Sequence, residues 1–444
     1  MTTSPDCNSI TARLADFVAQ KPVEAQDLHS AALFALDAVA NIVAGRRSGP
    51  GAILCNWAGT QSHANRPHDS GRRALLLGGL CHILEVDDLH RASVVHPGCV
   101  VVPAVWALGE ADNAGFDGKK ALTALLWGFE ACTRIGAAVG RAHYKIWHNT
   151  ATCGPFGAAL AAAHLLNLNK GQTVHALGNA GTQAAGLWQF LDTGAMSKHL
   201  HAGRAAEAGV VAAELAAAGF TGAPEILEGP RGFFAAMCPD GDATQVLADT
   251  HAPWQVHLTS IKPWPSCRHT HPAIDAAQEI RHDMVARGLM LDAVARVDVS
   301  TYQAALDLCD RPQPASVYDA KFSLQHTIAA ALAYDRIGFA AFEAQERDDL
   351  RALRGKITVQ RAAGFDRAYP RNWGSEVSVT LLDGSILSAS RCDAKGDPEA
   401  PLSDREMVDK ARDLLIFGDY GEPDRLIDAI LSMPAGGAVP RLGI

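Results

Sequence analysis

The sequence predicts a mainly α-helical protein, with a large all-helical domain and a smaller α+β lid domain. From residue 9 to about 260, apolar residues recur at three- and four-residue spacing, which is typical of packed helices. Alternation of apolar and polar residues begins only after residue 270 and indicates strands. With 444 residues and 48% hydrophobic content, the chain is long enough for two domains with a large buried core.

The helical domain is expected to comprise residues 1–268, with residues 396–444 returning to it as further helices. Three runs show the helical period most clearly, at 27–45, 121–142 and 204–220. Their interiors are rich in alanine and glycine, and small side chains permit a short distance between helix axes. We therefore expect the helices of this domain to pack closely.

The lid domain is expected to comprise residues 269–395 and to mix strands with helices. Three segments alternate apolar with polar residues: 295–302, 355–360 and 376–390. Asp383 and Gly384 lie in the last of these, and this dipeptide predicts a tight hairpin turn. We expect the active site to lie in a crevice between the two domains.

Composition excludes several classes of protein. The formal net charge of −9 argues against binding to nucleic acid, and the apolar runs appear too short or too interrupted for a membrane span. Ten cysteines occur without a C-x-x-C pair, and no apolar leader opens the chain. We therefore predict a cytoplasmic protein with reduced thiols and a small-molecule substrate.

Three segments are rich in histidine and charge: 81–98, 196–204 and 261–272. Lys198, in the second segment, is expected just before a helix. It is either a solvated lysine or, with the helix N-terminus, part of an anion site and a proton carrier. His96 and His271 each precede a proline, and each is either a turn residue or a member of a shared site.

A metal site is the weaker interpretation of the first segment. Glu85, Asp88 and His90 offer oxygen and nitrogen ligands, but no recognised metal-binding spacing surrounds them. The chain also has no P-loop and no G-x-S-x-G motif, and residues 178–186 lack the spacing of a dinucleotide-binding loop. We expect neither a metal nor an organic cofactor.

Several runs of the sequence resemble the MmgE/PrpD family: 37–45, 86–110, 128–136, 147–166, 197–234 and 262–276. This family includes 2-methylcitrate dehydratases, cis-aconitate decarboxylases and iminodisuccinate epimerases. The resemblance implies a helical domain with an α+β lid, a homodimer, no cofactor, and a di- or tricarboxylate substrate. Such reactions pass through strongly anionic intermediates, which cationic groups stabilise and acid–base groups protonate.

The resemblance places Lys198 and its neighbours around the substrate carboxylates, together with His96 and His271, and Tyr144, His148 or His271 could supply the second acid–base group. The catalytic candidates are Lys198, His271, His96, Tyr144 and His148. The candidates for substrate binding are Arg204, His201, Arg268 and Asp88.

The sequence departs from the family's dehydratase and decarboxylase pattern at two places. Residues 85–89 read Glu-Val-Asp-Asp-Leu where many members read Asp-Phe-Asp-Asp-Thr, and Leu308 stands where related decarboxylases carry tyrosine. We therefore predict an epimerase, an isomerase that transfers protons next to a carboxylate of an amino-dicarboxylate such as iminodisuccinate. The alternatives are a 2-methylcitrate dehydratase-like or cis-aconitate decarboxylase-like lyase, and a non-enzymatic scaffold that binds carboxylates.

Overall fold

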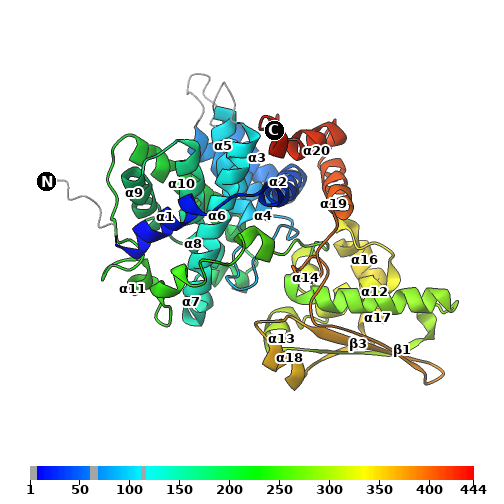
Figure 1. The fold of residues 1–444 in the computed structure, drawn as a ribbon. Helices are drawn as coiled ribbons and strands as arrows, with labels where there is room; N and C mark the ends of the chain where they lie inside the picture. The colour runs from blue at the N-terminus through cyan, green and yellow to red at the C-terminus, as the bar shows by residue number, and fades with distance from the viewer. Residues whose placement is uncertain (1–7, 61–68, 112–116) are drawn as a thin grey trace. The chain divides into compact units, whose positions relative to one another are not determined.

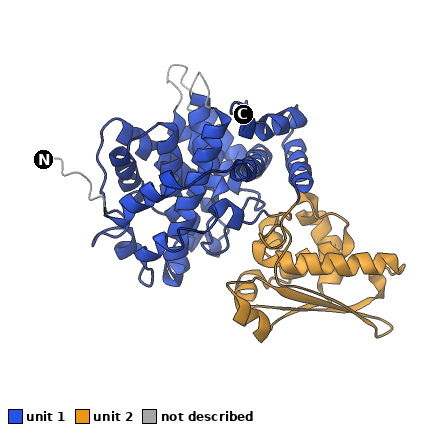
Figure 2. Ribbon diagram, viewed as in Figure 1, with its two compact units in different colours: residues 1–261, 403–444 blue, residues 262–402 orange. Residues whose placement is uncertain are grey.

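A computed structural model describes residues 8–60, 69–111 and 117–444 (Figure 1). Helices predominate in these ranges, and their strands form one four-stranded sheet, which confirms the mainly α class. The chain divides into two compact units (Figure 2). Unit 1 comprises residues 1–261 and 403–444, and unit 2 comprises residues 262–402.

The regular secondary structure in the described part of unit 1 is helical. Its helices are α1 (Ile10–Gln20), α2 (Ala25–Gly45), α3 (Gly49–Thr60), α4 (Ser70–His82), α5 (Gly98–Ala111), α6 (Gly118–Ala138), α7 (Arg141–Ile146), α8 (Asn149–Leu165), α9 (Lys170–Gly181), α10 (Ser197–Ala217), α11 (Phe233–Met237), α19 (Asp404–Phe417) and α20 (Pro423–Leu431). Short 3₁₀ helices are η1 (Trp188–Asp192), η2 (Ala243–Leu247), η3 (Gln255–Leu258) and η7 (Met433–Ala435).

Helix α2 is a core helix of unit 1. By length and composition it is apolar enough to cross a membrane, but 78% of its most apolar window is buried inside the structure. A buried carboxylate, Asp37, also lies in this helix and forms an ion pair of 2.5 Å with Lys410 on α19. Paired burial of this kind is expected of a helix in a protein core rather than in lipid.

Glycines bring α4 and α10 into close contact. A side chain at Gly78 on α4 would meet the Cα atom of Gly203 at 3.0 Å, and one at Gly203 would meet the carbonyl oxygen of Leu75 at 2.4 Å. This close approach fits the expected role of small residues in the helical region. It also places the N-terminal turns of α10 beside the C-terminal end of α4.

Unit 2 contains a mixed sheet packed against helices. Its strands are β1 (Val294–Thr301), β2 (Ile357–Arg361), β3 (Ser375–Leu381) and β4 (Ile386–Arg391), in the spatial order β2-β1-β3-β4. Strand β2 runs parallel to β1, and the other neighbours are antiparallel. The helices are α12 (His271–Ala286), α13 (Gln303–Cys309), α14 (Val317–Lys321), α15 (Leu324–Ala333), α16 (Ala344–Asp349), α17 (Arg351–Arg354) and α18 (Ala363–Ala368), with 3₁₀ helices η4 (Arg268–Thr270), η5 (Leu291–Ala293) and η6 (Phe339–Phe342).

The predicted hairpin joins β3 to β4. The backbone N–H of Leu381 donates to Ser385 at 2.8 Å, and Gly384 has a φ of 86°, a value that glycine adopts without strain. Inward residues of β3, such as Val377 and Val379, are fully buried, which explains the alternating pattern of this segment. The three strand segments expected from the sequence are therefore confirmed as strands.

Candidate active site

A buried polar loop connects α4 to α5 in unit 1 and provides the centre of the candidate site. Glu85, Asp87 and Asp88 are at most 2% exposed, and His96 near the end of the loop is 8% exposed. Glu85 has a φ of 62°, which is unusual for a residue with a side chain. Buried charge and backbone strain in one loop are common at functional sites.

The carboxylate of Asp87 holds two imidazole rings. Nδ1 of His82 bonds to Oδ2 of Asp87 at 2.6 Å, and Nδ1 of His96 lies 3.3 Å from the same oxygen. The two rings meet edge to face, with centroids 4.7 Å apart. An imidazole whose Nδ1 faces a carboxylate is fixed in orientation, and its Nε2 is left for proton exchange.

Asp87 is held in its charged form. Burial alone would raise the pKa of this carboxyl, but the neighbouring His82 and His96 lower the pKa well below its usual value. The arrangement therefore holds a negative charge against two imidazole rings in the protein interior.

Lys198 forms a buried ion pair with Glu85. The side chains of Lys198 and Glu85 are 8% and 3% exposed, so the interpretation of Lys198 as a solvated lysine is wrong. The expectation that Lys198 precedes a helix is also wrong, because α10 begins at Ser197 and the lysine lies in its first turn. The close packing of α10 on α4 brings the lysine to the loop.

His148 extends the cluster from the N-terminus of α8. Its ring stacks on His82 with centroids 5.6 Å apart, and its Nδ1 lies 3.3 Å from Nδ1 of His201 on α10. Burial, followed by the nearby His82 and Lys198, lowers the pKa of His148 well below its ordinary value. The ring is therefore neutral at neutral pH.

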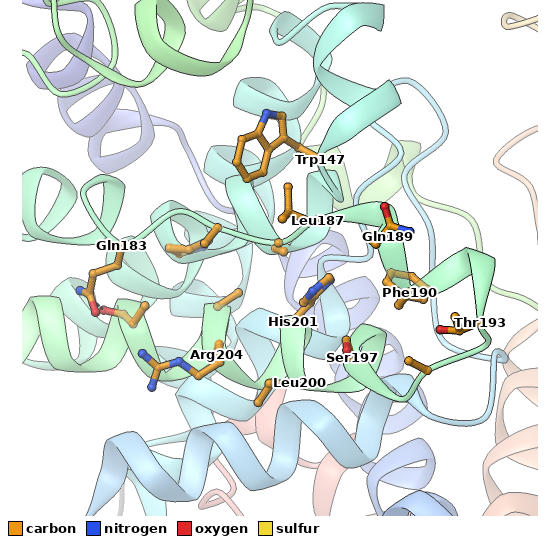
Figure 3. Close-up of a pocket in the computed structure, with 17 residues that line it drawn as sticks. Trp147, Gln183, Leu187, Gln189, Phe190, Thr193, Ser197, Leu200, His201 and Arg204 are labelled. Carbon is orange, nitrogen blue, oxygen red and sulfur yellow. Dashed lines mark hydrogen bonds between the residues drawn. The ribbon is translucent and has the colours of Figure 1, made fainter.

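A groove of about 660 Å³ opens beside this cluster, between α8, α10 and the segment that carries η1 (Figure 3). His201 and Arg204 line it, and in Figure 3 His201 points from α10 toward the segment of Leu187. Arg204 has a side chain that is 56% exposed and is paired with Glu207. Tyr144 packs edge to face on Trp188, with centroids 5.4 Å apart.

Asp88 has a structural contact that the sequence did not predict. Both of its carboxylate oxygens lie 3.0 Å from the backbone N–H of Gly98, the first residue of α5. Burial, followed by the charges of Asp87 and Asp37, raises the pKa of Asp88 well above its usual value. The observed contact fixes the loop to α5, so Asp88 serves here as a helix-terminal anchor.

The remaining candidates lie in unit 2. His271 is the first residue of α12, is fully buried, and donates from Nε2 to the carbonyl oxygen of Ser266 at 3.2 Å. Arg268 is 2% exposed and forms an ion pair with Asp397. The partners in these two contacts, Ser266 and Asp397, both belong to unit 2.

Sequence reasoning missed three participants: His82, Asp87 and, as the partner of Lys198, Glu85. All three lie in or next to segment 81–98, whose density of histidine and acid is the signal that could have found them. His82 in particular ends an apolar helix, where a buried imidazole requires a polar partner. The first and second segments do converge, through Lys198 and Glu85, which argues against a scaffold in which they lie apart.

Two groups of described side chains could hold a metal ion by geometry, since the ligand atoms of each lie within 4.8 Å of one another. They are His82, Asp87 and His96, and Asp393, Asp397 and Glu399. In the first group, Nδ1 of His82 lies 2.6 Å from Oδ2 of Asp87, so these two side chains hydrogen-bond to each other. In the second, Asp397 is already paired with Arg268.

We expect the protein to lose stability between about pH 6.5 and pH 4, because buried His90 stays neutral in the fold. Burial, followed by the charge of Arg91, lowers the pKa of His90 to about 4. The unfolded chain binds this proton near pH 6.5, so the free energy of unfolding falls as pH drops, by about 3 kcal/mol for this residue. Urea unfolding of the wild type and of His90→Gln at several pH values measures it. An equal pH dependence in both chains would contradict the expectation.

Comparison with known proteins identifies both parts of the chain. The MmgE/PrpD N-terminal domain matches residues 12–246, and the MmgE/PrpD C-terminal domain matches residues 264–429. A cis-aconitate decarboxylase of Aspergillus terreus is 25% identical over 96% of each chain. The cis-aconitate decarboxylase of Homo sapiens is 28% identical over 76% of this chain and 71% of its own. A 2-methylcitrate dehydratase of Cupriavidus necator is 28% identical over 28% of this chain and 27% of its own.

These relatives are named for decarboxylation or dehydration, so the prediction of an epimerase is wrong. The predicted isomerase class and the predicted iminodisuccinate substrate are wrong for the same reason. The prediction gave weight to two residues that have packing roles. Leu89 is 3% exposed and pairs its backbone with Ser260, and Leu308 packs against the core of unit 2. The two domain matches show that the chain belongs to the MmgE/PrpD family.

Proposed function

We propose that the protein is a lyase that decarboxylates cis-aconitate or a closely similar tricarboxylate. The observation that carries the proposal is one buried cluster that combines the Asp87–His96 pair with Lys198. The relatives named cis-aconitate decarboxylase support it, because they align over most of their own length. The dehydratases align over little more than a quarter of theirs.

The chemistry of decarboxylation requires what this cluster offers. When a carboxylate leaves as carbon dioxide, the electron pair of the broken C–C bond stays on the carbon skeleton and must be taken up by a proton. Positive charge fixed nearby stabilises the developing anion, and a buried site strengthens that interaction. Lys198 supplies the charge, and His96, oriented by Asp87, supplies the proton.

Glu85 competes with the substrate for Lys198. In the structure the lysine is neutralised by this carboxylate, so a substrate carboxylate has to replace Glu85 as its partner. We therefore assign Glu85 as a placeholder for a substrate carboxylate.

Dehydration of 2-methylcitrate is the second candidate, favoured by the match to dehydratases of that name. Removal of water needs a base for the proton on carbon and an acid for the leaving hydroxide. His96 and His148 are two separate imidazoles on the same cluster, and they could serve as this pair. This reaction takes up no net proton.

Proton NMR of the purified protein with each substrate tests the proposal. We expect cis-aconitate to disappear and an unsaturated dicarboxylic acid to form with release of carbon dioxide, while 2-methylcitrate persists. Loss of water from 2-methylcitrate with cis-aconitate unchanged would replace the first candidate by the second. No change in either substrate would refute both.

We expect activity to survive removal of metal ions. The proposed roles use imidazole, carboxylate and ammonium groups only, and none of them requires a metal ion. Turnover of cis-aconitate before and after exhaustive treatment with EDTA is the measurement. A loss that added zinc or magnesium restores would make His82, Asp87 and His96 metal ligands.

Several predictions from the sequence remain predictions. They are the assembly as a homodimer, the cytoplasmic location, the absence of a cofactor, the lid role of residues 269–395 and a substrate crevice between the domains. The catalytic role of His271 and the substrate-binding role of Arg268 belong with them. A double-mutant cycle of Lys198 and Arg268, measured as kcat/KM for cis-aconitate, tests whether both residues act on one bound substrate.

A further inference from the structure

The pair formed by His148 and His201 joins a buried ring to an open groove. His148 is 1% exposed and contacts the rings of His82 and Trp188. His201 lies on α10, is partly exposed, and lines the groove shown in Figure 3. Their Nδ1 atoms are 3.3 Å apart, so one nitrogen donates a hydrogen bond to the other.

The packing around His201 holds the ring in this position. Its ring meets Phe190 edge to face at 5.6 Å, and the backbone of Gly186 is so close that a side chain there would lie 3.3 Å from Nδ1 of His201. The backbone N–H of His148 donates to the carbonyl oxygen of Gly186 at 2.9 Å. The same short segment therefore fixes both imidazoles.

The proposed reaction has a proton requirement that this pair fits. Each decarboxylation consumes one proton, because the proton that replaces the lost carboxylate on carbon comes ultimately from solvent. A buried acid that gives up its proton must be reprotonated before the next turnover. Among the described contacts, His201 provides a polar connection from the buried imidazoles to the groove.

We propose that His201 carries protons from solvent in the groove to His148, and we rest this role on the decarboxylase function proposed above. His201 takes a proton from water or buffer at Nε2 and releases the proton on its Nδ1 to the lone pair on Nδ1 of His148. His148 then passes the proton on its other ring nitrogen to His96, the acid of the proposed reaction, which is close enough to contribute to the lowered pKa of His148. Each ring ends the step neutral, and one proton has moved inward.

The charges around the pair couple this transfer to substrate binding. Burial, followed by the charges of His82 and Lys198, lowers the pKa of His201 to about 4, so the ring is neutral while the site has no substrate. A bound tricarboxylate brings negative charge next to Lys198 and favours a proton on both rings. Proton uptake is therefore favoured when substrate is present.

Replacement of His201 by asparagine tests the role. Asparagine can still bond to His148 but does not exchange protons, so we expect kcat for cis-aconitate to fall about 10-fold or more with little change in KM. Added imidazole buffer should restore kcat in proportion to its concentration, because a free imidazole in the groove can replace the lost ring. His201→Gln is the second variant, and thermal unfolding confirms that each is folded.

His175→Asn is the matched control, because His175 lies on α9 and bonds to the backbone of Gly222, away from the cluster. It should keep the wild-type kcat and show no response to imidazole. An unchanged kcat in both His201 variants would overturn the role, and so would a raised KM without rescue, which indicates substrate binding instead. If the wild type releases no carbon dioxide from cis-aconitate, the proposed function falls, and this role falls with it.

Discussion

Lys198→Ala should lower kcat/KM for cis-aconitate by about 100-fold or more. The variant removes the buried positive charge that we place against the substrate carboxylate and leaves Glu85 without its ion-pair partner. A buried carboxylate that has lost its partner also destabilises the fold, by about 3 kcal/mol. Steady-state kinetics together with urea unfolding measure the two effects separately.

Two further variants separate charge from proton transfer and from stability. Lys198→Arg keeps the positive charge but does not release a proton at any working pH, so recovery of activity would make Lys198 a binding group only. The double variant Lys198→Met with Glu85→Gln removes both charges, and we expect its stability to return toward that of the wild type. Near-normal decarboxylation by Lys198→Ala would exclude the lysine from the reaction.

Asp87→Asn should lower kcat about ten-thousandfold, the scale seen when an imidazole loses its orienting carboxylate. The amide keeps the shape of the side chain but is neutral. His82 and His96 therefore lose the negatively charged oxygen that both rings face. We expect KM to change little, because Asp87 faces the imidazoles rather than a bound carboxylate.

The control for Asp87 is Asp88→Asn, one residue along the same loop. Asp88 contacts the backbone of Gly98, and its raised pKa makes a neutral side chain tolerable there. We therefore expect this variant to keep most of the activity. Equal losses in the two variants would indicate that the loop as a whole, rather than the charge of Asp87, is required.

Local patterns predicted the secondary structure well. The alternation at residues 376–390 and the dipeptide Asp383-Gly384 gave a correct hairpin, because one face of β3 is buried and the turn needs a positive φ. The spacing of apolar residues in 27–45 likewise predicted a helix, observed as α2. These features depend on neighbours within a few residues, which the sequence shows directly.

The site was predicted only in part, because its contacts join distant residues. The sequence showed that Lys198 lies in a charged cluster, but its partner Glu85 is 113 positions away and meets it through the packing of α10 on α4. His82 was overlooked because an imidazole at the end of an apolar helix looks like a core residue until Asp87 is placed beside it. Reaction type was misjudged because Leu89 was taken as evidence against a lyase, whereas the relatives of this chain are named decarboxylase and dehydratase.

The most direct test of decarboxylation at this cluster is a turnover experiment in D₂O with cis-aconitate. The wild type should release one carbon dioxide for each molecule consumed and place one deuterium on carbon in the product, whereas Lys198→Ala and Asp87→Asn should do so far more slowly. Loss of carbon dioxide at an unchanged rate in both variants would contradict the account, and so would a wild type that leaves cis-aconitate intact.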